Sequence, residues 1–316
     1  MKNAARPTLA FLCALAALAA LAALPSCRRK EPEDERSPIP PSALPPLAAP
    51  ASAYALPVAG FADAVVAVPA GVTRAAPVLV AVLGIGDTPE SQCAIWRELV
   101  GARAFVLCPR GLPHFVREAA PAAAGREASE ETDPAFATAI EETTEASPDS
   151  GRVTQVGFHH PDLATLEREV DAGLASLRAR VGAYVAAGPV LYTGFSRGAF
   201  LGASLVGKAP ERYSRAVFIE GGQSAWNDET AAAFAKHGGK RLLFACGRPS
   251  CVSESEAAAV ILGKHHVETR VVYGEGEGHD YKGEVKNQLR ASFDWVTDGD
   301  PLWRRQLVAG GRMDHR

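Results

Sequence analysis

The sequence predicts an α/β fold with a mainly parallel central sheet and helices on both faces. Short apolar runs rich in Val, Leu and Phe alternate with amphipathic stretches of helical length along most of the 316 residues, and this alternation is typical of βα units. Length and composition, with 47% hydrophobic residues, allow one sizeable domain plus terminal extensions. The formal net charge of −3 gives no support to nucleic-acid binding.

Seven strands are expected, within residues 61–68, 77–87, 104–111, 189–195, 214–222, 240–247 and 268–274. Helices are expected at 88–100, 161–184, 198–208, 229–236, 253–264 and 283–297. The first helix has a clear start, because Thr88 fits an N-cap and Pro89 a first-turn proline. Strands that alternate with helices in this way imply parallel pairing of most strands.

The N-terminal segment is predicted to be an export signal. Lys2 and Arg6 form a positive region before an almost unbroken run of Ala and Leu, which spans 9–24 and is followed by Leu-Pro-Ser-Cys, ending at Cys27. The segment resembles a bacterial lipoprotein signal peptide of residues 1–26, in which Cys27 becomes the lipidated first residue. This implies a lipid anchor in the cell envelope, with the outer membrane or periplasmic face favoured. An ordinary signal peptide or an N-terminal anchor helix is the alternative.

Composition divides the rest of the chain. Residues 27–55 are first charged and then proline-rich, which is typical of an extended tether. Residues 56–300 carry the alternation of strands and helices, and 301–316 form a tail. Residues 118–160 are predicted to be an irregular insertion, because 118–150 hold nine acidic residues and one basic residue among Ala, Pro and Ser. A surface excursion is favoured there over a lid.

Ser196 is the clearest candidate for chemistry, in the run Gly194-Phe195-Ser196-Arg197-Gly198. The run fits G-x-S-x-G, in which a sharp strand-to-helix turn exposes a strained serine and the glycines make room for it. An apolar β-type run precedes it and a helix-compatible run follows. This context favours a catalytic nucleophile over a polar residue in a tight turn.

His279 is the candidate base that a serine nucleophile needs. It lies on a glycine-rich loop after the last expected strand, and in this arrangement the base comes last in the chain. The pair His159 and His160 precedes the serine. The pair His265 and His266 sits at a helix end, where cations are favoured. Neither pair has the required order, so an exposed loop histidine is the main alternative reading of His279.

The oxyanion of an acyl-transfer intermediate needs two preorganised donors, typically backbone N–H groups. One is expected from Arg197, directly after the nucleophile. The other is expected from the loop "LGIGDT" after an early strand, with Ile85 the best candidate and Gly86 the next. Glycines on both sides of Ile85 let the backbone turn its amide toward the site.

These motifs resemble the α/β-hydrolase superfamily, especially its carboxylesterase and acyl-protein thioesterase branch. In that branch the oxyanion loop commonly reads L-H-G-L-G-D-T and the nucleophile turn G-F-S-Q-G-G, and here "VLGIGDT" and "GFSRGAF" are similar. "CPRG" and "GHDY" resemble two further motifs of the branch. The resemblance covers residues 56–295 and implies the α/β-hydrolase fold, acting on esters or thioesters. Leu83 in place of the histidine and Arg197 in place of the glutamine are departures that bear on the substrate.

The acid of the catalytic triad has no residue at its usual place. In the family it follows the strand that here is "RLLFACG", in a G-x-x-D pattern, but this sequence reads Gly247-Arg248-Pro249-Ser250-Cys251. Glu220, at the end of the preceding strand, is the preferred replacement, because some hydrolases of this fold carry the acid there. Glu254 is the second choice, although Ser253 begins a pattern like a capping box. Asp280 is poorly placed to orient its neighbouring histidine. A Ser–His dyad and a substrate-binding role for Glu220 are the remaining alternatives.

Six cysteines are present, but Cys13 leaves with the signal and Cys27 carries the lipid. Four remain, and an even number in an exported protein favours disulfides over free buried thiols. The favoured pairs are Cys93 with Cys108 and Cys246 with Cys251.

The sequence therefore predicts an exported serine hydrolase that cleaves a small-molecule carboxylic ester through an acyl-enzyme. Neither a metal nor an organic cofactor is implied. A serine peptidase of the same fold is one alternative. A non-catalytic binding protein, motivated by the displaced acid, is the other. Substrate identity, acyl-chain length and oligomeric state are not specified by the sequence.

Overall fold

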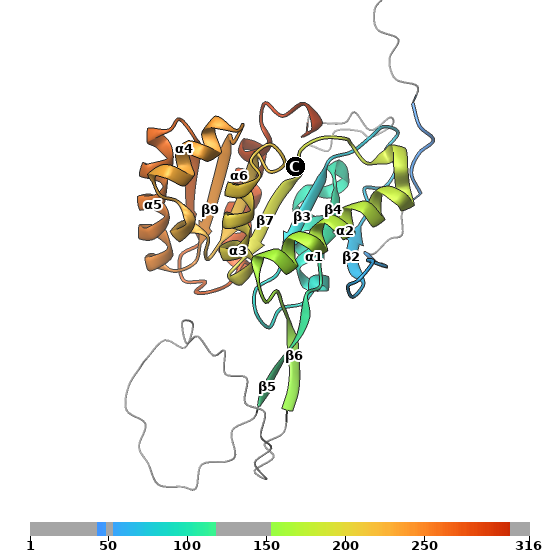
Figure 1. The fold of residues 1–316 in the computed structure, drawn as a ribbon, viewed down its shortest axis with the longest axis horizontal. Coiled ribbons are helices and arrows are strands. Elements are labelled where there is room, and N and C mark those ends of the chain that lie inside the picture. Colours follow the sequence, from blue (N-terminus) through green and yellow to red (C-terminus); the bar gives the residue numbers. More distant parts are fainter. Residues whose placement is uncertain (1–42, 49–52, 118–152, 304–316) are drawn as a thin grey trace, which may run out of the picture. The chain divides into compact units, whose positions relative to one another are not determined.

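The computed structural model of the chain describes residues 43–48, 53–117 and 153–303 (Figure 1). The expected signal peptide, Cys27 and the C-terminal tail beyond Trp303 lie outside the described residues, as does most of the expected acidic insertion. Among the residues that are described, no helix is long and apolar enough to cross a membrane.

One eight-stranded sheet forms the centre of the fold. Its strands lie in the order β1-β2-β4-β3-β7-β8-β9-β10. β1 with β2 and β2 with β4 are antiparallel, and all other neighbours are parallel. The predicted mainly parallel sheet is thus confirmed. The strands are β1 (Tyr54–Leu56), β2 (Ala64–Ala67), β3 (Val78–Val82), β4 (Phe105–Cys108), β7 (Leu191–Phe195), β8 (Arg215–Ile219), β9 (Arg241–Cys246) and β10 (Glu268–Tyr273).

Helices cover both faces of this sheet (Figure 1). α1 and α6 contribute apolar side chains to the core on one face, and α2, α3, α4 and α5 contribute to the core on the other. The helices are α1 (Pro89–Val100), α2 (Leu163–Val181), α3 (Arg197–Lys208), α4 (Asp228–Lys236), α5 (Pro249–Lys264) and α6 (Gly283–Thr297). The predicted two-sided covering is therefore confirmed.

The central strands are continuous apolar runs because both of their faces are buried. β3 shows this most simply, since all five of its residues are buried. Successive side chains of a strand point to opposite faces. Accordingly Val78, Val80 and Val82 pack in one core, while Leu79 and Ala81 pack in the other.

The observed start of α1 agrees with the predicted start, and that of α5 differs from it. The side chain of Thr88 accepts a hydrogen bond from the backbone N–H of Ser91, and Pro89 is in the first turn of α1, as predicted. α5 begins at Pro249 rather than at the expected residue 253. A proline is favoured at a helix start, because its fixed φ suits the first turn and its missing N–H is not needed there. The capping box expected at Ser253 was wrong, since Ser253 lies inside α5 and donates to the carbonyl of Ser250.

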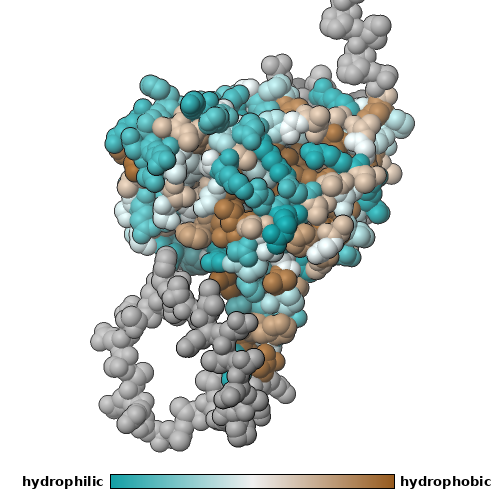
Figure 2. Space-filling model, in the orientation of Figure 1, coloured by the Kyte–Doolittle hydropathy of each residue, from teal (hydrophilic) through white to brown (hydrophobic). Residues whose placement is uncertain are grey.

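A separate antiparallel hairpin joins β5 (Leu112–Arg117) to β6 (Val153–His159). The sequence analysis placed residues 153–160 in an irregular insertion, and for β6 this was wrong. The hairpin escaped notice because most of its residues are exposed, which leaves no alternation of buried and exposed positions. Several of its large apolar side chains face solvent, and Figure 2 shows hydrophobic surface along it: Leu112, Phe115, Val116, Val153 and Val156.

Candidate active site

The candidate residues meet where the topology of the sheet changes direction. From β3 the chain continues into α1 on one face, whereas from the adjacent β7 it continues into α3 on the other face. Ligands of open α/β sheets bind at such a switch point, beyond the carboxyl ends of the strands. Ile85 follows β3 and Ser196 follows β7. Glu220 follows β8, and His279 lies on the loop between β10 and α6.

Ser196 occupies a strained turn between β7 and α3. Its φ is 50°, a left-handed value that non-glycine residues rarely adopt. Two close approaches explain the glycines around it. A Cβ atom on Gly194 would lie 2.4 Å from the carbonyl carbon of Gly198, and one on Gly198 would lie 2.5 Å from the carbonyl oxygen of Val82. The G-x-S-x-G pattern is therefore a steric requirement of this turn.

Ser196, His279 and Glu220 form a continuous hydrogen-bonded chain. Ser196 Oγ lies 2.8 Å from His279 Nε2, and His279 Nδ1 lies 3.1 Å from Glu220 Oε2. The tautomer that satisfies both contacts has the proton on Nδ1, which donates to the carboxylate. Nε2 is then free to accept the serine proton. This is the order of nucleophile, base and orienting acid in a catalytic triad.

Glu220 is held as a buried carboxylate. Its residue is 4% exposed, and its backbone is also left-handed, with a φ of 52°. Oε1 accepts hydrogen bonds from the N–H groups of Gly247 at 2.6 Å and Arg248 at 3.1 Å, and Oε2 accepts one from Arg248 Nε at 2.6 Å. Burial by itself raises the pKa of this carboxyl, but the hydrogen bonds from His279, Gly247 and Arg248 and the charge of Arg248 together lower it.

The other candidate acids have different partners. Glu254 accepts a hydrogen bond from Gln223 Nε2 at 2.5 Å on the surface. Asp280 Oδ1 accepts the backbone N–H groups of the next two residues, so its carboxylate closes a local turn. Among the described residues, Glu220 is the carboxylate that contacts the His279 ring.

The other histidine pairs lie in other surroundings. His160 is fully buried and its Nε2 lies 3.2 Å from Glu169 Oε2. His265, at the end of α5, has its Nε2 3.1 Å from Oδ1 of Asp228, the first residue of α4. The structure thus brings His279 to Ser196 and gives His160 and His265 different partners.

The loop after β3 packs directly against the nucleophile. A Cβ atom on Gly84 would lie 3.0 Å from Ser196 Cβ. The N–H of Gly86 donates to the carbonyl of Phe158 at 3.0 Å, so it is not available as an oxyanion donor. The N–H groups of Ile85 and Arg197 donate to no other group within the described part of the chain. Ile85 and Arg197 are therefore the two backbone donors that fit an oxyanion hole.

Asp87 joins this oxyanion loop to the histidine loop. Its Oδ2 accepts hydrogen bonds from the Tyr281 hydroxyl at 2.7 Å and from Gln92 Nε2 at 2.9 Å. Burial and the neighbouring Asp87 both raise the pKa of Tyr281, which keeps its hydroxyl a neutral donor. The Tyr281 ring also packs edge-on against Phe195, with centroids 4.7 Å apart. Asp87 lies in the motif "LGIGDT" and Tyr281 in "GHDY", but the sequence alone predicted no role for either residue.

The side chain of Arg197 is hydrogen-bonded to the backbone, so it is not a free cation in the site. Its guanidinium donates to the carbonyl of His160 at 3.3 Å and to that of Pro161. His160 in turn lies against Glu169 of α2. Oε1 of Glu169 accepts hydrogen bonds from the N–H groups of Arg110 and Gly111, at 2.8 and 3.0 Å. This buried network fixes the segment between β6 and α2 beside the nucleophile turn. Nothing in the sequence pattern indicated it.

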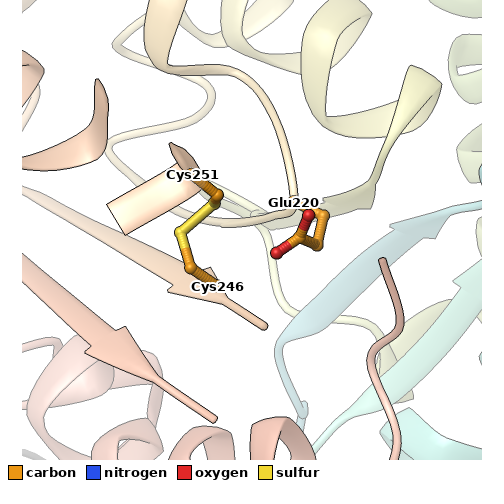
Figure 3. Close-up of side chains that lie close together, drawn as sticks. All are labelled: Glu220, Cys246 and Cys251. Carbon is orange, nitrogen blue, oxygen red and sulfur yellow. A yellow bond between two sulfur atoms is a disulfide. The ribbon is translucent and has the colours of Figure 1, made fainter. Parts of the chain in front are cut away.

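Both expected disulfides are present, Cys93–Cys108 and Cys246–Cys251. The second lies beside Glu220 (Figure 3), where the sulfur atoms and a carboxylate oxygen come within 4.8 Å of one another. Cysteine binds metals as a thiolate. Because these two sulfurs are bonded to each other, the cluster has the chemistry of a structural support and not of a metal site.

A hollow of about 420 Å³ lies in the described part of the chain. It is bounded by the loop at Gly60–Ala62, the start of β5 and the side chains of Thr165 and Glu169. Ser196 and His279 are not among its lining residues. Its position therefore does not identify where an acyl chain binds.

The sheet order, with its antiparallel second strand, and the nucleophile turn between β7 and α3 are the features that define a known fold. The chain has the α/β-hydrolase fold. The candidate nucleophile, acid and histidine follow one another in the chain in the order of that fold, Ser196, Glu220 and His279.

Comparisons with known proteins find only distant similarity. No protein-family model matches the sequence, and no curated protein is similar to it. Similar solved structures include an uncharacterised protein from Bacillus cereus, with 12% identity over 71% of this chain and a TM-score of 0.48. The chain spans 60% of the length of that protein. TT1662 from Thermus thermophilus has 15% identity over 80% of this chain and 99% of its own, with a TM-score of 0.47. The Bacillus cereus carboxylesterase has 18% identity over 75% and 95%, with a TM-score of 0.45.

Proposed function

We propose that the protein is a serine hydrolase that cleaves carboxylic esters, or thioesters, through an acyl-enzyme. The observation that carries this proposal is the chain of contacts from Ser196 Oγ to His279 Nε2 and from His279 Nδ1 to Glu220. A serine hydroxyl is a weak nucleophile without a base, and this arrangement supplies one. Two uncommitted backbone N–H groups next to the serine support the same chemistry.

The first half of the reaction follows from this geometry. His279 Nε2 takes the proton as Ser196 Oγ bonds to the ester carbonyl carbon, and the carbonyl oxygen gains the negative charge. The N–H groups of Ile85 and Arg197 stabilise that oxygen. When the tetrahedral intermediate collapses, the bond to the alcohol oxygen breaks. His279 gives its proton to the departing alcohol, and the acyl group remains on Ser196.

The second half releases the acid. A water molecule gives a proton to His279 and bonds to the acyl carbon, and the oxyanion again lies against the same two N–H groups. His279 then returns the proton to Ser196 Oγ as the acyl bond breaks. Glu220 holds the imidazole in one orientation and stabilises its cation throughout, which requires the carboxylate form. The lowered pKa of Glu220 supports that form at neutral pH.

We also propose an envelope location for the enzyme, with Cys27 as the lipidated residue. The two disulfides support an oxidising compartment, where such bonds persist. Substitution Cys27→Ala is expected to abolish incorporation of radiolabelled palmitate. Retention of the label in this variant would contradict the proposal.

Hydrolysis of p-nitrophenyl acetate, butyrate and octanoate by the full chain tests the function. The wild type is expected to turn over at least one of these esters, and Ser196→Ala is expected to lose the activity. Preference for aminoacyl-p-nitroanilides with negligible ester hydrolysis would instead favour a serine peptidase. A folded wild type that neither hydrolyses an ester nor reacts with a fluorophosphonate would favour a non-catalytic binding protein.

A further inference from the structure

The connection between β9 and α5 contains the residues that surround the triad acid. β9 ends at Cys246 and α5 begins at Pro249, so Gly247 and Arg248 form the whole connection. The disulfide between Cys246 and Cys251 closes this connection, with Cα atoms 5.6 Å apart (Figure 3). Cys246 and Cys251 are buried, at 0% and 3% exposure.

This disulfide-closed loop provides three of the four hydrogen bonds that Glu220 accepts. The N–H groups of Gly247 and Arg248 bind Oε1, and Arg248 Nε binds Oε2. The fourth hydrogen bond comes from His279 Nδ1, also to Oε2. The direction in which Glu220 presents Oε2 to the histidine is therefore set by the loop.

The same loop also supports the histidine loop. The carbonyl of Gly247 accepts the N–H of Gly278 at 3.2 Å, and Gly278 directly precedes His279. The two backbones are so close that a Cβ atom on Gly247 would lie 2.3 Å from the carbonyl oxygen of Gly278. One short loop thus fixes both the acid and the base.

We propose that Cys246, Cys251 and Arg248 are positioning residues of the catalytic centre, acting on His279 through Glu220. This inference rests on the proposed function, because it assigns them to that reaction. Arg248 lies in the connection after the strand that usually precedes the acid in the family, and here its guanidinium supports an acid on the neighbouring strand. Misplacement of a catalytic group by about 1 Å costs on the order of 100-fold in rate, so such a support has a measurable effect.

Removal of each disulfide separately tests the inference. Cys246→Ala with Cys251→Ala is compared with Cys93→Ala with Cys108→Ala, which removes a bond between α1 and β4. Below the thermal unfolding temperature of each variant, the first pair is expected to lower kcat roughly 10-fold to 100-fold with little change in KM. The second pair is expected to leave kcat unchanged. It is expected to lower Tm more than the first pair does, because Cys93 and Cys108 are 15 residues apart in the sequence and Cys246 and Cys251 only 5.

A double-mutant cycle separates positioning from general loosening of the fold. In a Glu220→Gln background, removal of Cys246–Cys251 is expected to lower kcat by much less than in the wild type, because both changes act through one carboxylate. An equal loss of kcat in both backgrounds would overturn the inference. So would an unchanged kcat after removal of this disulfide from the otherwise wild-type chain.

Arg248 is tested by its own substitutions. Arg248→Gln is expected to lower kcat on the order of 10-fold, and Arg248→Lys to recover part of it, because an ammonium keeps the charge beside Glu220. Arg212→Gln, which removes an arginine that pairs with Asp171 on α2, is the matched control with unchanged kcat. A kcat for Arg248→Gln equal to that of the control would overturn the role of Arg248. A wild type without any fluorophosphonate labelling would overturn the proposed function itself.

Discussion

Two neighbouring strand ends carry the proposed nucleophile and the proposed acid, and they are alike in backbone but not in surroundings. Ser196 after β7 and Glu220 after β8 have φ values of 50° and 52°. The turn at Ser196 is crowded, with glycines where a Cβ atom would lie within 2.4 to 2.5 Å of backbone atoms. After Glu220 the approaches are looser, since a Cβ atom on Gly221 would lie 3.0 Å from the carbonyl oxygen of Ser196 and one on Gly222 would lie 2.9 Å from the carbonyl oxygen of Ala199.

This difference explains why one strand end carries a motif and the other does not. A nucleophile must be presented at the tip of a tight turn into a helix, and the turn imposes glycines at fixed positions. An acid needs only to place a carboxylate oxygen near the histidine. Side chains from more than one strand end meet that need, so the position of the acid is free to change.

Removal of the nucleophile or the base is the largest expected effect. Ser196→Ala or His279→Ala is expected to lower kcat by about 10⁴-fold or more, because each removes the covalent step or its proton transfer. The measurement is initial-rate hydrolysis of p-nitrophenyl butyrate by folded variants. The double variant is expected to be no worse than either single variant, and a strictly multiplicative loss would contradict a shared role.

Removal of the acid is expected to cost less. Glu220→Gln retains the shape of the side chain but favours the wrong imidazole tautomer, and a loss of about 10²-fold to 10⁴-fold in kcat is expected. Glu254→Gln, the carboxylate that bonds to Gln223 on the surface, is the matched control with unchanged rate. Equal losses in the two variants would contradict the assignment of the acid.

Alanine at the two strand ends tests the difference in crowding directly. Gly198→Ala is expected to destabilise the fold by about 1–3 kcal/mol, because its Cβ atom would meet the carbonyl of Val82 at 2.5 Å. Gly221→Ala is expected to cost less, since its nearest contact would be at 3.0 Å. The measurement is denaturant unfolding of both variants beside the wild type. A larger loss of stability in Gly221→Ala than in Gly198→Ala would contradict the difference in crowding between the two strand ends.

The pH dependence of stability is the smallest effect. The pKa of Glu220 is lowered from an ordinary 4.5, so its ionised form stabilises the folded state above that pH, and the contribution is lost as pH falls through the lower, folded pKa. The stability gap between wild type and Glu220→Gln is therefore expected to be widest at neutral pH and to narrow in acid. Denaturant midpoints at several pH values measure the gap, and a gap that widens in acid would contradict the lowered pKa.

The sequence predicted those parts of the site that short-range geometry imposes. Ser196 and Ile85 lie in turns with a glycine on either side, and the tight backbone geometry there requires these glycines. The central strands were predicted because both of their faces are buried, which makes them continuous apolar runs. The hairpin of β5 and β6 was not predicted, since its residues are mostly exposed and show no alternation of apolar and polar positions. The hydrogen bond from Tyr281 to Asp87 was not predicted for another reason, because it joins residues 194 positions apart and leaves no local pattern.

The most direct test is the rate at which a fluorophosphonate labels the full chain, with the modified residue located by mass spectrometry. A single adduct on Ser196 in the wild type is predicted, together with slower labelling of Glu220→Gln and an unchanged rate for Glu254→Gln. This result would show a serine activated by a histidine that Glu220 orients. A folded wild type without an adduct on Ser196, or equal labelling rates for wild type and Glu220→Gln, would contradict the account.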